Sequence, residues 1–239
     1  MKLLALDTAT EACSVALSVD GEIIERFELA PRRHTELILP MAESVLAEAG
    51  LGLRDIDLFA FGAGPGSFTG LRIAAGVVQG LALGLDRPVV PVCTLETLAE
   101  GARRRGMLKG VDIVLAAIDA RMSEVYWAEC RPDATGRMRK RAPARVEAAA
   151  SVSVAGTGPV AGVGSGWASY ADALGHASAG RVGVIDADAL PRAVDMLELA
   201  LSAWEQGQAL PAEAAQPVYV RNHVADIPPT PDLSRLSGR

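Results

Sequence analysis

Two aspartates, Asp7 and Asp119, are the residues of this chain best placed to do chemistry, because each follows an apolar run and precedes a short polar turn. Carboxylates at the ends of strands handle Mg²⁺ and phosphate in two-domain nucleotide folds. The competing interpretation of each aspartate alone is a turn residue that accepts hydrogen bonds from nearby backbone amides. The pair predicts a cleft for Mg²⁺ and phosphate if the two turns face each other.

A glycine-rich loop, GAGPGSFTGLR at residues 62–72, could supply the amides of such a cleft. It follows a strand-like run and opens a long apolar segment, so the order is strand, loop, helix. Backbone N–H groups at a helix start suit a phosphate, although the loop has neither Walker nor dinucleotide spacing. A capped tight turn is the competing interpretation. A second glycine-rich run, AGVGSGW, lies at residues 161–167. The candidate nucleotide-site residues are Asp7, Gly64, Gly66, Ser67, Thr69 and Asp119.

Hydrolytic and metal chemistry have little support. The nucleophile elbow G-x-S-x-G does not occur. The three histidines share no motif, so neither a triad nor a histidine metal pair is visible; they are His34, His176 and His223. Three widely spaced cysteines without C-x-x-C predict reduced thiols in a cytoplasmic protein. No run of about 18 residues is free of polar or small residues, so we expect no membrane span.

The formal net charge of −6 argues against a chain that binds nucleic acid alone, because phosphate binding requires a basic face. The exception is RPDATGRMRKRAPAR at residues 131–145, which has six basic residues and one acid, Asp133. A loop of this kind is usually solvated surface, and an RNA or an acidic partner is the sharper alternative.

Two segments that contain the aspartates resemble each other, residues 2–18 and 112–129. Each is predicted as a strand, an aspartate turn and a returning strand. This repeat indicates a duplicated α/β unit, and the arginine run before Gly106 marks a boundary. We expect domains at 1–104 and 105–239, the second smaller and with a loosely held tail from residue 225.

Two helices are expected between the copies, over residues 35–49 and 70–85. The second is apolar nearly all round and must be covered on more than one side, by this chain or by a partner. Its glycines recur at every fourth residue and form a line that another backbone can approach. Each costs roughly 1 kcal/mol relative to alanine, which implies a packing benefit. The predicted apolar interface comprises His34, Leu37, Met41, Val45, Leu71, Ile73, Gly76, Val77, Gly80 and Gly84.

Several stretches together closely resemble the TsaB family, also called YeaZ. They are MKLLALDTATEACSVAL, the His34-Thr35-Glu36 opening with LILP, AGPGSFTGLRI, RPVVPVCTLETLA and the late PVYVR. The resemblance is strong over residues 1–130 and looser beyond. It implies the α/β actin-like, Hsp70-like (ASKHA) fold of two ribonuclease-H-like domains. It also implies a role in making threonylcarbamoyladenosine beside the anticodon of tRNA, where the paralogue TsaD transfers the group and TsaE is an ATPase partner.

The family comparison also separates the chain from its catalytic paralogue. TsaD carries a metal motif, H-x-E-x-H, after a similar strand, and the matching stretch here is Thr94-Leu95-Glu96-Thr97-Leu98. Both histidines are replaced, so a metal cannot be held in that way. The resemblance therefore implies no metal, no catalytic residue and no cofactor of its own, apart from a weak adenine nucleotide at a vestigial site.

The function implied is a non-catalytic, cytoplasmic scaffold that binds and activates TsaD, and TsaE through the complex. The two helices would form a helical bundle with the partner, or a homodimer when the partner is absent, and tRNA would be met indirectly or through the complex. One alternative is an actin-like ATPase or carbamoyl-type transferase that uses Asp7, Asp119 and the glycine loop. A protease acting on the partner is the other, and the sequence displays no nucleophile for it.

Overall fold

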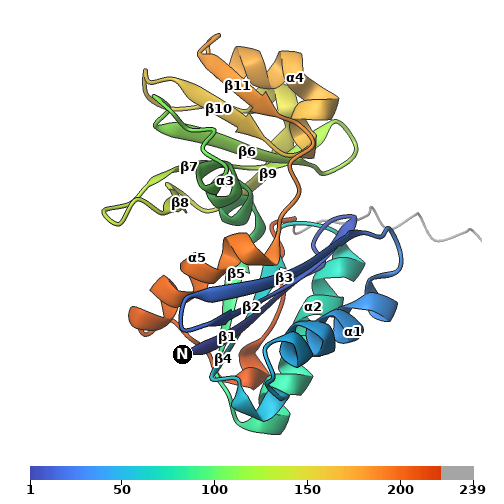
Figure 1. Cartoon of the computed structure of the whole chain (residues 1–239). Coiled ribbons are helices and arrows are strands. Elements are labelled where there is room, and N and C mark those ends of the chain that lie inside the picture. The colour runs from blue at the N-terminus through green and yellow to red at the C-terminus, as the bar shows by residue number, and fades with distance from the viewer. Residues whose placement is uncertain (222–239) are drawn as a thin grey trace, which may run out of the picture.

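The computed structural model describes residues 1–221, which form two lobes, each built on a mixed sheet (Figure 1). The predictions for the tail from residue 225 and for His223 lie outside the described residues.

The first sheet has the strand order β3-β2-β1-β4-β5. Its strands are β1 (Lys2–Asp7), β2 (Ala12–Val19), β3 (Glu22–Leu29), β4 (Leu58–Gly64) and β5 (Val89–Cys93). The first three form an antiparallel meander, whereas β4 is parallel to β1 and β5 is parallel to β4. Since both faces of β1 and β4 are covered, these strands are continuous apolar runs instead of alternating ones.

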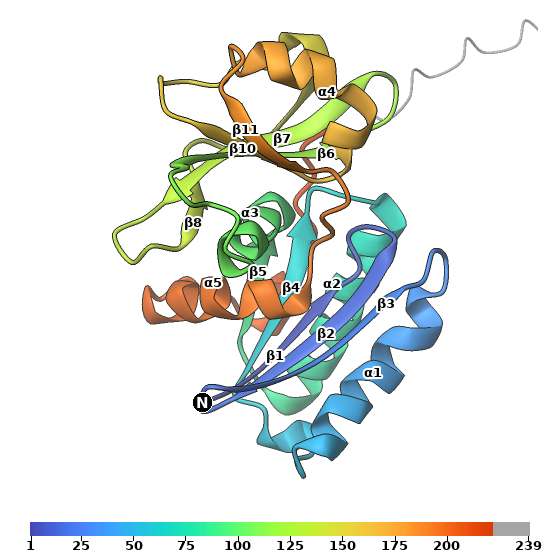
Figure 2. The same ribbon diagram turned by 45° about the horizontal axis from the view of Figure 1, so that its top comes forward.

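Helices cover both faces of this sheet (Figure 2). On one face lie α1 (His34–Glu48) and α2 (Phe68–Leu85), which share a core with Leu4 and Leu6 of β1. On the other lies α5 (Ala193–Glu205), whose Met196 packs with Leu3 and Ala5. The short turns η1 (Leu53–Asp55) and η3 (Ala212–Ala214) complete this lobe, and η3 contacts α2.

The second sheet repeats the first in the order β11-β10-β6-β7-β8, with β9 also paired to β7. Its strands are β6 (Ile113–Asp119), β7 (Glu124–Pro132), β8 (Met138–Lys140), β9 (Arg145–Ala148), β10 (Val160–Val163) and β11 (Val182–Asp186). Again an antiparallel hairpin that turns at an aspartate is followed by two parallel strands. The two predicted hairpins and the duplication they indicate are confirmed. Helix α4 (Ser165–Ala177) follows β10, and η2 (Ala149–Ser151) follows β9.

Two helices cross between the lobes. Helix α3 (Thr94–Arg104) follows β5 of the first sheet yet packs its Leu95 and Leu98 on the second. Helix α5 follows β11 of the second sheet yet packs on the first, and the two helices contact each other between the sheets (Figures 1 and 2). The division at 104/105 stays a prediction, to which the structure adds that α5 and η3 lie with the first lobe.

Helix α2 is the one helix within residues 1–221 whose length and hydropathy would suit a membrane span. Its buried side chains, Leu71, Ala74, Ala75, Val78 and Ala82, lie on the face towards the sheet, as in the core helix of a globular domain.

Candidate functional site

The glycine loop between β4 and α2 packs against the turn between β1 and β2. Ser67 N–H donates to the Ala9 carbonyl at 2.7 Å, and the Thr8 hydroxyl donates to the Gly70 carbonyl at 2.7 Å. A Cβ on Gly66 would lie 2.4 Å from the Ala9 oxygen, and one on Gly70 would lie 1.9 Å from the Thr8 oxygen. These glycines are therefore required by the close approach of the chain's own turn. Ser67 also caps α2 by accepting from Gly70 N–H at 3.4 Å, as the turn interpretation predicts.

Asp7 is completely buried beneath this loop. Its Oδ1 accepts the Ala9 N–H at 2.9 Å, and its Oδ2 has no hydrogen-bond partner among the described residues. A Cβ on Gly62 would lie only 2.0 Å from Oδ2, so glycine at 62 is what admits the carboxyl. Desolvation raises the pKa of Asp7 to about 7, and the Ala9 bond offsets this only in part. The expectation that Asp7 faces an open cleft is wrong, because it has no exposed surface.

Asp119 occupies the matching position at the end of β6, where its carboxylate contacts its own neighbours. Oδ1 accepts Arg121 N–H at 2.8 Å and the Tyr170 hydroxyl at 3.3 Å, and Oδ2 pairs with the Arg121 guanidinium at 3.3 Å. The Asp119 N–H donates to Ser165 Oγ at 3.2 Å. This is the turn-residue interpretation, completed by two side chains of the second lobe.

The second glycine-rich run is filled by its own tryptophan. Trp167 is 1% exposed, and its Nε1 donates to the Leu115 carbonyl at 2.9 Å. A Cβ on Gly162 would lie 2.3 Å from the Trp167 ring, and one on Gly164 would lie 2.5 Å from the Ala117 oxygen. The ring therefore occupies the space that the small residues leave above β6.

A cleft of about 950 Å³ opens between the lobes, and neither aspartate lines it. The glycine loop, β5, β8, α5 and the C-terminal segment line it, among them Gly64, Pro65, Val92, Lys140, Leu199 and Tyr219. The binding of a weak adenine nucleotide at the vestigial site stays a prediction.

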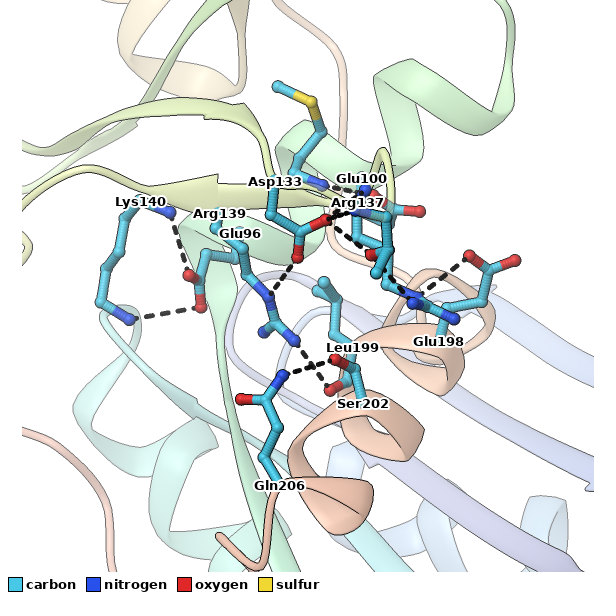
Figure 3. A network of polar contacts seen from close by, with 12 residues as sticks. Glu96, Glu100, Asp133, Arg137, Arg139, Lys140, Glu198, Leu199, Ser202 and Gln206 are labelled. Carbon is cyan, nitrogen blue, oxygen red and sulfur yellow. Dashed lines mark hydrogen bonds and ion pairs between the residues drawn. The ribbon is translucent and has the colours of Figure 1, made fainter.

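Glu96, which matches the glutamate of the H-x-E-x-H motif, supports the edge strand β8 (Figure 3). Glu96 accepts the backbone N–H of Lys140 at 3.0 Å and its Nζ at 3.2 Å. One helical turn later, Glu100 accepts the Met138 N–H at 2.9 Å and Arg103 Nε at 2.8 Å. Both carboxylates thus bind β8 to α3. Within residues 1–221, no group of three or more His, Cys, Asp or Glu side chains could hold a metal.

The glycine line of α2 faces outward. A Cβ on Gly76, Gly80 or Gly84 would have nothing within 4 Å, and all three residues are exposed. Ile73 and Val77 lie half-buried beside the line. Leu83 and Phe68 of the same helix are 56% and 54% exposed. We call the exposed surface of α1 and α2 the helix-pair face; Leu37 and Met41 of α1 are its half-buried members.

Three of the predicted interface residues are buried instead. Val45 is 0% exposed and Leu71 2%, and both lie inside the first lobe because they face the sheet. His34 is 8% exposed, and its Nε2 has no partner within the described residues. The interface itself stays a prediction.

The PVYVR motif spans the two lobes, a role that its sequence did not disclose. We call residues 217–221 the C-terminal strap. Val218 N–H donates to the Ala63 carbonyl at 2.8 Å, and Tyr219 lies 5.8 Å from the Phe68 ring. Arg221 then reaches the second lobe, where it pairs with Glu124 and donates to the Ala120 carbonyl at 3.2 Å. Tyr219 and Arg221, an aromatic residue and an arginine two positions apart, were the only sign in the motif that it could contact both lobes.

The repeated strand order, with an aspartate-ended hairpin opening each sheet, defines the actin-like (ASKHA) class of two ribonuclease-H-like domains. Residues 27–157 match the family model described as TsaD, tRNA N6-adenosine threonylcarbamoyltransferase. The chain belongs to the TsaB family. It is 46% identical over 231 residues to the tRNA threonylcarbamoyladenosine biosynthesis protein TsaB of Escherichia coli, covering 94% of this chain and 96% of the relative.

Two further comparisons agree with this family. The TsaB protein of Haemophilus influenzae is 41% identical over 232 residues, covering 94% of this chain and 95% of that protein. The solved structure of YeaZ from Pseudomonas aeruginosa superposes with a TM-score of 0.81 at 44% identity, covering 91% of this chain and 99% of that one. The resemblance found in the sequence is therefore confirmed over nearly the whole chain.

Proposed function

We propose that this chain is a non-catalytic subunit of tRNA threonylcarbamoyladenosine synthesis, which binds and activates its TsaD paralogue through the helix-pair face. TsaE joins through the complex, and a second copy of the chain occupies the same face when the paralogue is absent. Family membership supports the pathway. The paralogue and the activating role are our own inference.

The contacts of the candidate catalytic residues support the non-catalytic assignment. Asp7 is buried against Gly62, and Asp119 is bound by Arg121 and Tyr170. Glu96 holds the edge strand β8, and the flanking Thr94 and Leu98 are not metal ligands of the histidine type. The polar groups that an actin-like enzyme would direct at a substrate are thus used within the fold.

The observation that carries the proposal is the outward glycine line of α2. Glycine in an exposed helix interior costs roughly 1 kcal/mol relative to alanine, and here no side chain of residues 1–221 occupies the space above it. Apolar side chains flank the line on the same helix. A second helix can therefore approach closely and bury an apolar centre, which is the usual make-up of a protein interface.

Replacing Gly80 with leucine tests this interface. The variant is expected to fold, with slightly higher stability because leucine favours helix by roughly 0.5–1 kcal/mol. Its affinity for the TsaD paralogue, measured by calorimetry and sizing, is expected to fall by about tenfold or more, since an inserted side chain prevents close helix packing.

Gly175→Leu is the matched control. Gly175 lies inside α4 of the other lobe and also has nothing within 4 Å of a built Cβ. It should leave assembly unchanged. Equal binding by the wild-type chain and the Gly80→Leu variant would refute the interface. Tight adenine-nucleotide binding with turnover by the isolated chain would instead favour the enzyme alternative.

A further inference from the structure

The basic run at 131–145 contains a hollow between β8 and β9, which pair with different parts of the same edge of β7. Strand β8 pairs with residues 130–132 of β7, and β9 pairs with residues 124–127. The segment between β8 and β9 leaves the sheet beside Ala128 and Glu129. The hollow measures about 330 Å³ and is lined by Trp127, Glu129, Arg131, Arg141, Pro143, Arg145 and Ser153, together with three alanines.

Three arginines surround this hollow, and two of them have no acidic partner. Arg131 is held by Glu129 at 2.7 Å and by the Ala155 carbonyl at 3.1 Å. Arg141 and Arg145 are exposed, and within residues 1–221 neither forms an ion pair. The other basic residues of the run are paired inside the chain: Arg137 with Glu198, Arg139 with Asp133 and Lys140 with Glu96.

The nearby acids do not neutralise these two guanidinium groups. The Glu129 carboxylate is taken by Arg131 and by the Ala155 N–H at 3.0 Å. Glu147 accepts Trp127 Nε1 at 2.7 Å. Arg145 lies over the Trp127 ring, with 5.8 Å between its Cζ and the ring centroid, so its planar group is held at the rim of the hollow.

We propose that Arg141 and Arg145, with Arg131 behind them, bind the phosphodiester backbone of tRNA at this hollow, which we call the arginine hollow. The chemistry is that of guanidinium groups on phosphate oxygens, with a stacked arginine plane available to an unpaired base. This proposal rests on the proposed function, because that function is what makes tRNA the expected ligand. It adds a direct contact between this chain and tRNA, which the proposed function leaves to the partner proteins.

An RNA fits the arginine hollow better than an acidic protein does. Protein interfaces centre on large apolar or aromatic side chains that become buried. The large apolar side chains that residues 1–221 expose lie elsewhere, for example Leu83, Met122 and Trp204, and none lines the arginine hollow. Besides Trp127, Glu129 and Ser153, the walls are alanines and Pro143, and these short side chains let a sugar–phosphate chain approach the arginines closely.

The test measures binding of a tRNA transcript that carries the adenosine to be modified. Fluorescence anisotropy across a salt series is recorded for the full chain, alone and with the TsaD paralogue. The Arg141→Glu/Arg145→Glu variant is expected to bind about tenfold more weakly near 0.1 M salt, and its salt slope to fall by about 1–2. Arg141→Gln/Arg145→Gln should lose part of this affinity.

The control is Arg54→Glu/Lys109→Glu, which makes the same change of net charge at two exposed positions outside the arginine hollow. It should alter tRNA affinity by less than about twofold, because distant surface charges are screened. Size-exclusion chromatography of the same mixtures measures assembly with the paralogue separately. A failure of the proposed function would therefore appear as a loss of assembly, and a failure of the arginine hollow as equal tRNA binding by the wild type and the variant.

Equal tRNA binding by wild type and the double charge reversal, alone and with the paralogue, overturns the proposal, including when neither binds. It is also overturned if the reversal abolishes assembly with the paralogue but not tRNA binding, because the surface would then recognise an acidic protein.

Discussion

At the scale of single residues, Asp7 is a carboxyl at a position expected to bind Mg²⁺ and phosphate, yet it is completely buried in the first lobe. Glycine at 62 leaves room for it, and the packed loop excludes water from it. Burial without an opposite charge favours the neutral form, which is why its pKa rises to about 7. A carboxyl in this state is a weak ligand for Mg²⁺ at neutral pH.

Asp7 should make the protein less stable as the pH rises. Its pKa in the folded chain is about 7 against 3.8 in the unfolded chain, so the folded state binds the extra proton between these values. The contribution of Asp7 to stability is therefore full below about pH 4, is lost as the pH rises through 7 and then levels off, a loss of a few kcal/mol at most. Asp7→Asn cannot ionise and should abolish this fall, as measured by urea unfolding at pH 4.5 and pH 8.

Asp119→Asn is the comparison, because it makes the same change at the matching position of the second repeat. There the carboxylate pairs with Arg121, so the variant should lose about 1 kcal/mol of a charge-assisted interaction. If Asp7→Asn were instead as destabilising at pH 8 as at pH 4.5, the buried carboxyl would not be the source of the pH dependence.

At the scale of elements, α3 supports β8 through carboxylates instead of a neighbouring strand. An edge strand presents N–H groups without partners, and two glutamates one helical turn apart accept those of Met138 and Lys140. Glu100 is completely buried, and Arg103 supplies its counter-charge. Glu96, which matches the glutamate of the H-x-E-x-H motif, thus belongs to a structural pair with Glu100.

Removing the Glu100 carboxylate should therefore destabilise the fold. Glu100→Ala leaves the Met138 N–H without its acceptor and leaves the Arg103 guanidinium with Glu198 alone, at an expected cost of about 3 kcal/mol. Glu48→Ala removes the acid of an exposed pair with Arg26 and should cost less than about 1 kcal/mol. Denaturant unfolding of both variants decides this, and similar losses would contradict a special role for Glu100.

The sequence was sufficient for the elements whose pattern is local. The two hairpins, the glycine loop and the line of Gly76, Gly80 and Gly84 along one side of α2 were predicted from periodicity and composition. The packing of α5 on the first sheet was not, because an amphipathic pattern does not say which sheet its apolar side meets. Strands β8 and β9 were missed because they are only three and four residues long. In addition, β8 is basic and its support comes from two glutamates distant in the sequence.

The same distinction applies to the candidate site. The alignment of the α2 glycines follows from one helix, whereas their exposure and the burial of Val45 and Leu71 depend on how the helices sit on the sheet. The burial of Asp7 depends on Gly62, which is far away in the chain. Properties set by one element were predictable, and those set by the meeting of two were not.

At the scale of the whole molecule, four connections join the lobes. Helices α3 and α5 each lie against the sheet of the other half, and Arg192 next to α5 pairs with Glu25 at 2.6 Å. The edge strand β8 is bound to α3, and Arg139 donates to the Leu199 carbonyl of α5 at 3.4 Å. The C-terminal strap is the fourth connection, and it begins beside the N-terminal end of α2.

The strap places the helix-pair face in physical contact with the second lobe. Arg72 of α2 lies over the Phe68 ring and, at 5.3 Å, over the Tyr219 ring. Two residues later, Arg221 bonds Ala120 and Glu124 in the turn that contains Asp119. The contacts from Phe68 and Arg72 through Tyr219 to Arg221 thus form one continuous path from α2 to the second lobe.

The coupling across the strap can be measured with a double-mutant cycle of Arg221→Ala and Glu124→Ala. The Arg221 side chain is only 19% exposed, so its pair with Glu124 is partly shielded from water. We expect a coupling of about 1 kcal/mol in the free energy of unfolding, more than for an open surface pair. The exposed pair of Arg26 and Glu48 is the control cycle, with an expected coupling below about 0.5 kcal/mol. Hydrogen exchange in β6 and β7 should rise in Arg221→Ala but not in Arg26→Ala, because only the first releases the strap from the second lobe. Equal couplings in the two cycles, with unchanged exchange, would mean that the strap rests on the second lobe without holding it.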